Sequence, residues 1–198
     1  YTYDFVLPPS RNGLEPAFAL TYNSQDTDAE SIVGFGWSLS IPFIERVNDG
    51  GLEDLYDDTS FFSSLSSGEL VPVALTDTQH GTYAAHVESG GFLSYTFDTS
   101  NESWIVEDTL GNTYTFGTST DSRLDNAHIG DGSKVYRWML TEMRDANDNF
   151  VRYSYTKSDG QVYPSSILYT GHGSTDGIFE LSFAYETRAD AVTRYATG

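Results

Sequence analysis

Residues 135–155 read VYRWMLTEMRDANDNFVRYSY, and this segment indicates the architecture most directly. It begins with two alternating sets of side chains, the period-two pattern of a β-strand with two different faces. The first set is Tyr136, Trp138 and Leu140, and the second is Val135, Arg137, Met139 and Thr141. An Asp- and Asn-rich stretch follows, which suits a tight hairpin turn. Tyr153 and Tyr155 then lie two apart in a further run, so the segment predicts an antiparallel hairpin.

The same alternation recurs at residues 17–22, 93–97, 113–116 and 178–185. Turn signals rich in Gly and Asn separate these runs, and 15% of the chain is aromatic. Aromatic residues favour strands, and strands joined by short turns pair as antiparallel neighbours. We therefore predict an all-β fold of antiparallel strands and hairpins.

Two stretches depart from this pattern. Residues 187–195 are the most helix-like part of the chain. Residues 52–68 are acidic and rich in Ser, and they predict a long connection that Phe61, Phe62 and Leu65 hold against the core.

One internal similarity stands out. Residues 108–116 and 145–153 start 37 positions apart and share the pattern Asp-x-x-(Gly/Asp)-Asn-x-x-x-aromatic. In each copy we expect the Asp side chain to cap the turn and the Asn to take the left-handed backbone conformation. Two copies are too few to define a repeat architecture.

Length and charge narrow the possible functions. A chain of 198 residues suits a single domain over residues 1–198. Its net charge is −19 and its only lysines are Lys134 and Lys157, which argues against binding nucleic acid or an anionic membrane. The acidity fits either solubility or cation binding. No apolar run has the length of a membrane-spanning helix, so we expect no membrane insertion.

The chain has no cysteine, which excludes disulfides, thiol nucleophiles and Cys-ligated metals. It begins with Tyr1 rather than Met and shows no signal peptide. We therefore expect a fragment of a longer polypeptide.

Catalytic motifs are missing from the sequence. Gly36-Trp-Ser38-Leu-Ser40 lacks the second Gly that a nucleophile elbow requires, and no Gly-rich phosphate-binding motif occurs. Paired carboxylates for glycoside hydrolysis stay open, because their separation depends on the fold. Asn101-Glu-Ser103 is a glycosylation sequon that matters only in a eukaryotic secretory host.

Metal-ligand patterns are weak. His80, His86, His128 and His172 show no zinc spacing. Asp145-x-Asn147-x-Asn149 imitates the start of an EF-hand loop, but Phe150 and Thr156 replace its required Gly and Glu. Two acidic groups could hold calcium, although solvated acidic loops are the favoured interpretation of both: Asp54, Asp57 and Asp58, and Asp26, Asp28 and Glu30. We predict no catalytic, cofactor-binding or metal residues and no cofactor.

Six groups of residues, in order along nearly the whole chain, resemble the SpvB / insecticidal toxin complex B-component family. They are Pro8-Pro-Ser-Arg-Asn-Gly-Leu-Glu-Pro16 with Ala19-Leu-Thr-Tyr-Asn-Ser24; Gly34-Phe-Gly-Trp-Ser-Leu-Ser-Ile-Pro42 with Ile44-Glu-Arg46; Tyr56-Asp-Asp58 with Gly68-Glu-Leu-Val-Pro-Val73; Tyr114-Thr-Phe-Gly117 with Asp121-Ser-Arg123; Val135-Tyr-Arg-Trp138 through Asp145 and Asn149 to Tyr153-Ser-Tyr155; and Tyr185-Glu-Thr-Arg-Ala-Asp190 with Tyr195-Ala-Thr-Gly198. Asp148 stands where the family's YD-type turn usually has Gly.

The resemblance implies a secreted or releasable bacterial protein whose strands form part of a larger Rhs/YD-type β shell; a β-sandwich-like domain is the other architecture. Such a shell encapsulates or delivers a toxin effector. The implied partners are the rest of the polypeptide, with its YD repeats, and other toxin-complex subunits. In SpvB a separate ADP-ribosyltransferase domain follows, but its Glu-x-Glu motif does not occur here, so that activity is not carried over.

Two further classes stay open at this stage. The chain could be an extracellular surface module that binds glycans or a protein partner through exposed aromatic residues, or, less favoured, an enzyme with acidic catalysts. For a shell component we expect unpaired strand edges, and so aggregation of the isolated fragment above micromolar concentration.

Overall fold

The computed structural model of residues 1–198 describes all of the chain except residues 26–30, 49–50, 52–53, 127–130 and 187–198. The described part consists of antiparallel strands and one short 3-10 turn, η1 (Thr120–Ser122). The prediction of an all-β antiparallel fold is confirmed. The predicted helix at residues 187–195 lies outside the described residues.

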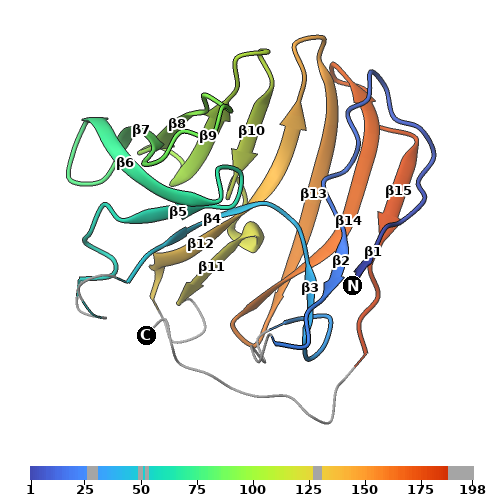
Figure 1. Ribbon diagram of the computed structural model, residues 1–198, viewed down its shortest axis with the longest axis horizontal. Coiled ribbons are helices and arrows are strands. Elements are labelled where there is room, and N and C mark those ends of the chain that lie inside the picture. Colours follow the sequence, from blue (N-terminus) through green and yellow to red (C-terminus); the bar gives the residue numbers. More distant parts are fainter. Residues whose placement is uncertain (26–30, 49–50, 52–53, 127–130, 187–198) are drawn as a thin grey trace.

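Eight strands close into a barrel, which we call the ring (Figure 1). Seven of them follow one another as neighbours, and β12 closes the circle by pairing with β4 on one side and with β10 on the other. The strands are β4 (Phe43–Arg46), β5 (Phe61–Ser63), β6 (Gly68–Leu75), β7 (Gly81–Ala85), β8 (Ser94–Asp98), β9 (Ser103–Glu107), β10 (Thr113–Phe116) and β12 (Asp131–Arg144).

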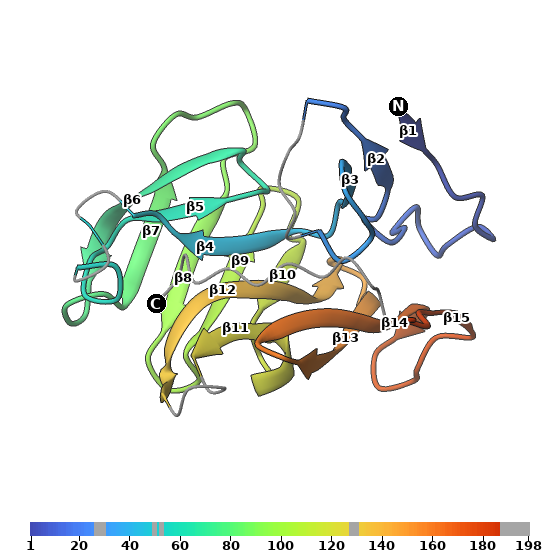
Figure 2. The same cartoon turned by 90° about the horizontal axis from the view of Figure 1, so that it is seen from below.

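The sheet continues beyond β12 as an open extension. β13 (Asn149–Ser158) pairs with β12, β14 (Gln161–His172) follows, and β15 (Phe179–Ser182) ends the order. β11 (Arg123–Asn126) pairs separately with β12. A small sheet of β1 (Thr2–Tyr3), β2 (Leu20–Tyr22) and β3 (Trp37–Leu39) lies beside β14 and β15 (Figures 1 and 2). We call β13–β15 and this small sheet together the wing.

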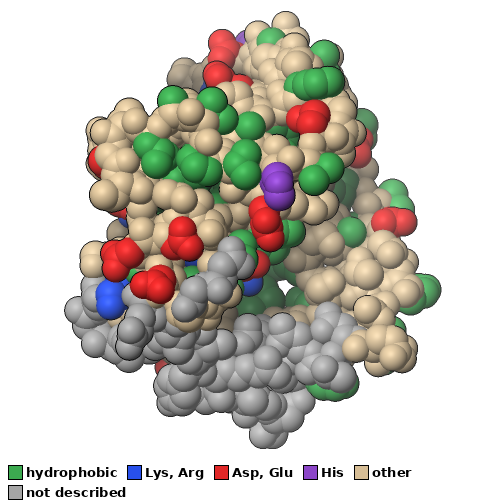
Figure 3. Space-filling model, turned by 60° about the vertical axis from the view of Figure 1, so that its left-hand side comes forward, with side chains coloured by type: hydrophobic (Ala, Val, Ile, Leu, Met, Phe, Trp, Pro, Cys, Tyr) green, Lys and Arg blue, Asp and Glu red, His purple; other side chains and the backbone are tan. Residues whose placement is uncertain are grey.

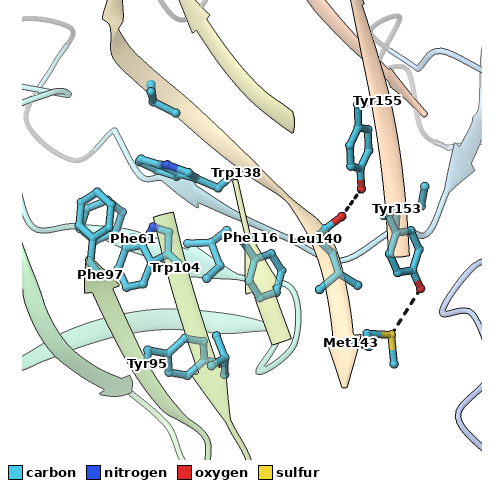
Figure 4. Close-up of a cluster of buried hydrophobic side chains, with 14 of the residues drawn as sticks. Phe61, Tyr95, Phe97, Trp104, Phe116, Trp138, Leu140, Met143, Tyr153 and Tyr155 are labelled. Atoms are coloured by element: carbon cyan, nitrogen blue, oxygen red, sulfur yellow. Dashed lines mark hydrogen bonds between the residues drawn. The ribbon is translucent and has the colours of Figure 1, made fainter. Parts of the chain in front are cut away.

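Aromatic side chains fill the interior of the ring (Figure 4). Phe97 and Trp104 stack with centroids 4.6 Å apart, and Phe61 meets Trp104 edge-on at 4.9 Å. Trp138 closes the cluster and donates its indole N–H to the carbonyl oxygen of Glu102 over 2.8 Å. Aromatic rings supply both buried area and specific pair geometry, so this cluster is the main stabilising element of the ring.

Two details of the sequence prediction are wrong. Residues 52–68 are not one long connection, because they contain β5, whose Phe61 is fully buried in the aromatic cluster. The alternation also predicts that Val135 and Trp138 lie on opposite faces of their strand, but both side chains are buried. The cause is a register shift in the pairing of β11 with β12, between Leu124 and Asp125. A β-bulge of this kind breaks strict alternation within one strand.

Candidate functional site

The two similar turns have the same hydrogen-bonding pattern. In the first, Asp108 Oδ1 accepts the backbone N–H groups of Leu110 and Asn112, and Asp108 Oδ2 accepts the Asn112 side-chain amide. In the second, Asp145 accepts the equivalent groups of Asn147 and Asn149 over 2.8–2.9 Å. The predicted Asp cap is therefore confirmed in both copies.

The prediction that the Asn of each turn takes the left-handed backbone conformation is wrong. Gly111 (φ 81°) and Asp148 (φ 61°) take the left-handed conformation, each one residue before the Asn. Three hydrogen bonds join the Asn to the capping Asp. The backbone N–H and the side-chain amide of the Asn donate to the Asp carboxylate, and the backbone N–H of the Asp donates to the Asn carbonyl oxygen. The sharp change in backbone direction therefore occurs at Gly111 and at Asp148, one residue before the Asn.

Asp145 is the more constrained of the two capping residues. Its carboxylate also accepts the side-chain amide of Asn12 over 3.0 Å, which ties the segment between β1 and β2 to the turn that joins β12 of the ring to β13 of the wing. Burial raises the pKa of Asp145, but the bonds from Asn149, Asn12 and the backbone outweigh it and lower the pKa to about 2. Because N–H donors occupy the carboxylate, the EF-hand-like spacing here forms a turn cap.

A buried cation lies at one end of the ring. The Arg46 side chain is almost fully enclosed, donates to the carbonyl oxygen of Val135 over 2.9 Å, and donates to Gln79 Oε1 over 3.0 Å. Its guanidinium also lies 5.1 Å from the ring of Phe61. Burial lowers the pKa of Arg46, and the negative charge of Glu102 opposes that shift. Arg46 therefore links β4 to β12 and to the loop between β6 and β7, which is a structural role.

His80 links two hairpins near this end. Its Nδ1 lies 2.8 Å from Asp77 Oδ2 and its Nε2 lies 3.1 Å from Glu102 Oε1, while the imidazole stacks on Phe97 at 4.3 Å. The neighbouring Tyr83 hydroxyl donates to the Gln79 carbonyl, and burial raises the pKa of Tyr83 to about 12. A phenol with a raised pKa is a poor nucleophile, so this cluster does not resemble an activated catalytic group.

The other sequence candidates lie apart. Ser38 is exposed on β3, and its Oγ lies 3.5 Å from the carbonyl oxygen of Thr21. His86 and His172 are exposed. The Asp58 carboxylate accepts the N–H of Thr59 and the hydroxyl of Ser60, as a local turn cap does. Within the described residues, no three His, Asp or Glu side chains converge as metal ligands. His128, Asp26, Asp28 and Glu30 lie outside that part of the chain.

An apolar groove in the wing was not predicted from the sequence. The groove has a volume of about 630 Å³ and separates the small sheet from β15. Its walls include Phe5, Phe18, Leu20, Leu39, Leu181 and Phe183. Phe5 stacks on Phe18 at 4.4 Å, and Phe18 meets Phe183 edge-on at 5.9 Å, so the two sheets touch beside the opening. The alternating apolar residues near each end of the chain indicate strands, but the sequence does not show that the two sheets they form lie side by side.

These features define a class: an all-β domain with a closed antiparallel barrel, an attached open sheet and polar clusters used mainly to hold loops. No helix in the described residues is both long and apolar enough to cross a membrane. The family model SpvB, described as Salmonella virulence plasmid 65kDa B protein, matches residues 3–176. The chain belongs to the SpvB family.

Solved structures agree with this assignment at the level of the fold. The N-terminal domain of the effector protein SpvB from Salmonella typhimurium strain LT2 is 22% identical, with a TM-score of 0.63 over 81% of this chain and 62% of that one. The TcdB2-TccC3-TEV crystal structure is 20% identical, with a TM-score of 0.72 over 96% of this chain and 11% of that one. The Photorhabdus luminescens Tc holotoxin pore is 20% identical, with a TM-score of 0.69 over 92% of this chain and 10% of that one.

The chain thus spans less than two thirds of the SpvB domain structure and about a tenth of the toxin-complex chains. No curated protein sequence matches it.

Proposed function

We propose that this chain is a non-catalytic structural domain of a secreted bacterial toxin-complex-like protein, in which it contributes to a β-strand shell that encapsulates or delivers a toxin effector. One observation carries the proposal: 96% of the chain matches a portion amounting to 11% of the TcdB2-TccC3-TEV chain. A domain of this fold is therefore, in that structure, a small part of a much larger polypeptide.

The shape of the wing supports a role inside a larger assembly. In the structure as described, β15 pairs with β14 on one side only, and the groove beside it is lined mainly by apolar side chains. Unpaired edges and apolar openings favour contact with a neighbouring chain segment. The natural neighbours are the rest of the same polypeptide, with YD repeats, and other toxin-complex subunits.

The state of the polar groups supports the non-catalytic part of the proposal. The carboxylates of Asp108 and Asp145 accept the hydrogen bonds that cap their turns, and the guanidinium of Arg46 donates to carbonyl and amide oxygens. The rings of the central aromatic cluster, such as Phe97, Trp104 and Trp138, are buried, which leaves these side chains unable to stack on sugars. We assign residues 1–198 to one domain of the longer polypeptide.

Limited proteolysis of the native parent polypeptide, read by mass spectrometry, tests the proposal. We expect residues 1–198 to stay uncut within one large protected core that also shields a C-terminal segment. Parent protein unfolded in urea before digestion is the control, and it should be cut throughout. Early release of a folded fragment near residues 1–198 would contradict the shell role and favour the alternative, an extracellular module that binds glycans or a protein partner.

A further inference from the structure

One turn between β1 and β2 carries the dipeptide Asn12-Gly13, and Asn-Gly occurs nowhere else in the sequence. The turn is closed by the backbone N–H of Leu14, which donates to the carbonyl oxygen of Arg11 over 3.0 Å. The φ angles of Asn12 and Gly13 are 52° and 74°, and a type I′ turn requires positive values at both positions. Both residues are exposed to solvent.

Asn-Gly is the dipeptide in which a backbone nitrogen most easily attacks the asparagine side chain that precedes it. Glycine has no Cβ atom to shield its nitrogen, and its backbone adopts many conformations. Apart from its chain neighbours, no atom lies within 4 Å of the position that a Cβ atom on Gly13 would take. Among the described residues, no acceptor takes a hydrogen bond from the Gly13 N–H. The nucleophile of this reaction is therefore accessible.

The reaction needs water and no other reactant. The Gly13 nitrogen loses its proton and attacks the side-chain carbon Cγ of Asn12, the bond from Cγ to Nδ2 breaks, and that nitrogen leaves as ammonia. Water then opens the resulting succinimide ring at either of its two carbonyl carbons. The product at position 12 is aspartate or isoaspartate. One water molecule is consumed for each ammonia released, and nothing is oxidised or reduced.

Asp145 restrains this reaction in the folded chain. Its Oδ2 accepts the Asn12 side-chain amide over 3.0 Å, and the buried carboxylate is itself fixed by donors from Asn147 and Asn149. Ring closure requires the backbone and side-chain torsions of Asn12 to rotate together, which the bond to Asp145 and the bond within the turn both oppose. The reaction therefore depends on a local opening of residues 11–14, and such openings cost less free energy than global unfolding.

The product is unable to restore the contact. A carboxylate at position 12 has no N–H to donate, and it faces a second carboxylate. Burial raises and the hydrogen bonds lower the pKa of Asp145, to about 2, so this group is ionised at neutral pH. Arg144 already pairs with Glu142 and Asp148. Arg11 is exposed, where solvent and salt screen its charge. The two carboxylates therefore repel each other.

The charge of the whole molecule acts in the same direction. The chain carries a net charge of −19, and Figure 3 shows acidic side chains spread over one face with only small patches of Lys and Arg. A net charge far from zero opposes the compact state through self-repulsion. One more carboxylate adds to that repulsion.

We propose that Asn12 is a site of spontaneous deamidation, which begins when residues 11–14 open locally and which then keeps this segment detached from the turn between β12 and β13. Leu14 belongs to the same segment and packs against the core, so detachment exposes apolar surface. A reversible opening thus becomes a permanent one. The proposal rests on this turn alone and does not depend on the shell role.

The rate is measured on the parent polypeptide, incubated at mildly alkaline pH and mapped by liquid chromatography and mass spectrometry, which separate the asparagine, aspartate and isoaspartate forms. Unfolding in urea should speed deamidation of Asn12 at least tenfold. In folded protein, Asp145→Ala should speed it at least fivefold, because the amide loses its acceptor. Asp108→Ala is the matched control: it removes the equivalent cap from the other turn, and the rate at Asn12 should stay within twofold of wild type.

The consequence is tested with Asn12→Asp, which mimics the product. Hydrogen exchange at the Leu14 and Glu15 amides, both bonded within the turn, should become at least tenfold faster. In an Asp145→Asn background the same change should alter exchange less than threefold, because the amide at position 145 can donate to the new carboxylate.

Thermal melting identifies any variant that fails to fold, and the comparison of folded and urea-treated wild-type protein keeps the test valid without variants. The proposal is overturned if Asn12 reacts no faster in urea than in folded protein, or if folded Asp145→Ala reacts within twofold of wild type. Unchanged exchange of the turn amides in Asn12→Asp would overturn it as well.

Discussion

The ring and the wing are built from the same kind of strand, yet they bury their side chains very differently. In the ring, Phe61, Trp104 and Trp138 are completely enclosed. In the wing, Phe18, Leu39 and Phe183 are only partly buried beside an open groove. Closure gives each strand of the ring two partner strands and encloses the core of the ring, whereas the wing ends in strands that have one partner. The difference indicates that the ring stabilises the fold, and it supports the proposal that the wing contacts a neighbouring chain segment.

The largest expected effect is a loss of ring packing. Trp104→Ala should lower the free energy of unfolding by about 3–5 kcal/mol, because it removes the centre of the aromatic cluster. Phe18→Ala in the wing should cost less than about 2 kcal/mol, since Phe18 already borders open space. Urea unfolding of residues 1–198 measures both. Equal losses would remove the distinction between ring and wing.

The link between ring and wing comes next. Asp145→Ala should cost about 2–3 kcal/mol, because it leaves the donors of Asn12, Asn147 and Asn149 without their charged acceptor. Asp108→Ala is the matched control in the other turn and should cost about 1 kcal/mol less, since it has no equivalent of Asn12. If Asp108→Ala proves the more damaging change, the bond to Asn12 does not join the two regions.

Acidity should weaken the same link. The folded pKa of Asp145 is lowered to about 2 from an ordinary value of 3.8. A lowered pKa contributes stability that is complete above the ordinary value and is lost as the pH falls towards the folded one. Stability should therefore decline between about pH 4 and pH 2. Asp145→Asn should flatten part of this decline in urea melts taken across that range, and an unchanged slope would show that Asp145 is not responsible.

The smallest effects concern the two turns themselves. Gly111→Ala should cost about 1 kcal/mol, because φ of 81° is unfavourable for any residue with a Cβ atom. Asp148→Gly should change stability by less than about 1 kcal/mol, in the stabilising direction, because it relieves the same strain and loses only an exposed ion pair with Arg144. Thermal melts resolve the two signs, and a destabilising Asp148→Gly would contradict the strain argument.

The sequence predicted the parts of this molecule that depend on local pattern. Alternation located β8, β10, β13 and the edge strand β15, and the repeated Asp and Asn residues located both turn caps. It missed β5, because a strand of three residues inside an acidic, Ser-rich stretch has too little periodicity to recognise. It also missed the bulge that brings Val135 inside, since bulges depend on pairing with β11.

The candidate surfaces were less predictable than the strands. Ring closure by β12 brings together residues almost one hundred positions apart, such as Arg46 and Val135, and no local pattern encodes that contact. The groove requires the small sheet to lie beside β15, which is again a tertiary property.

Hydrogen–deuterium exchange of residues 1–198 alone and within the parent polypeptide tests most directly whether the ring is self-sufficient and the wing requires a neighbour. The account predicts that the amides of β8, β9 and β12 exchange slowly and equally in both. It predicts that β15 and the sheet of β1–β3 exchange rapidly in the isolated chain and become protected in the parent. Equal protection of the wing in both samples would contradict the account.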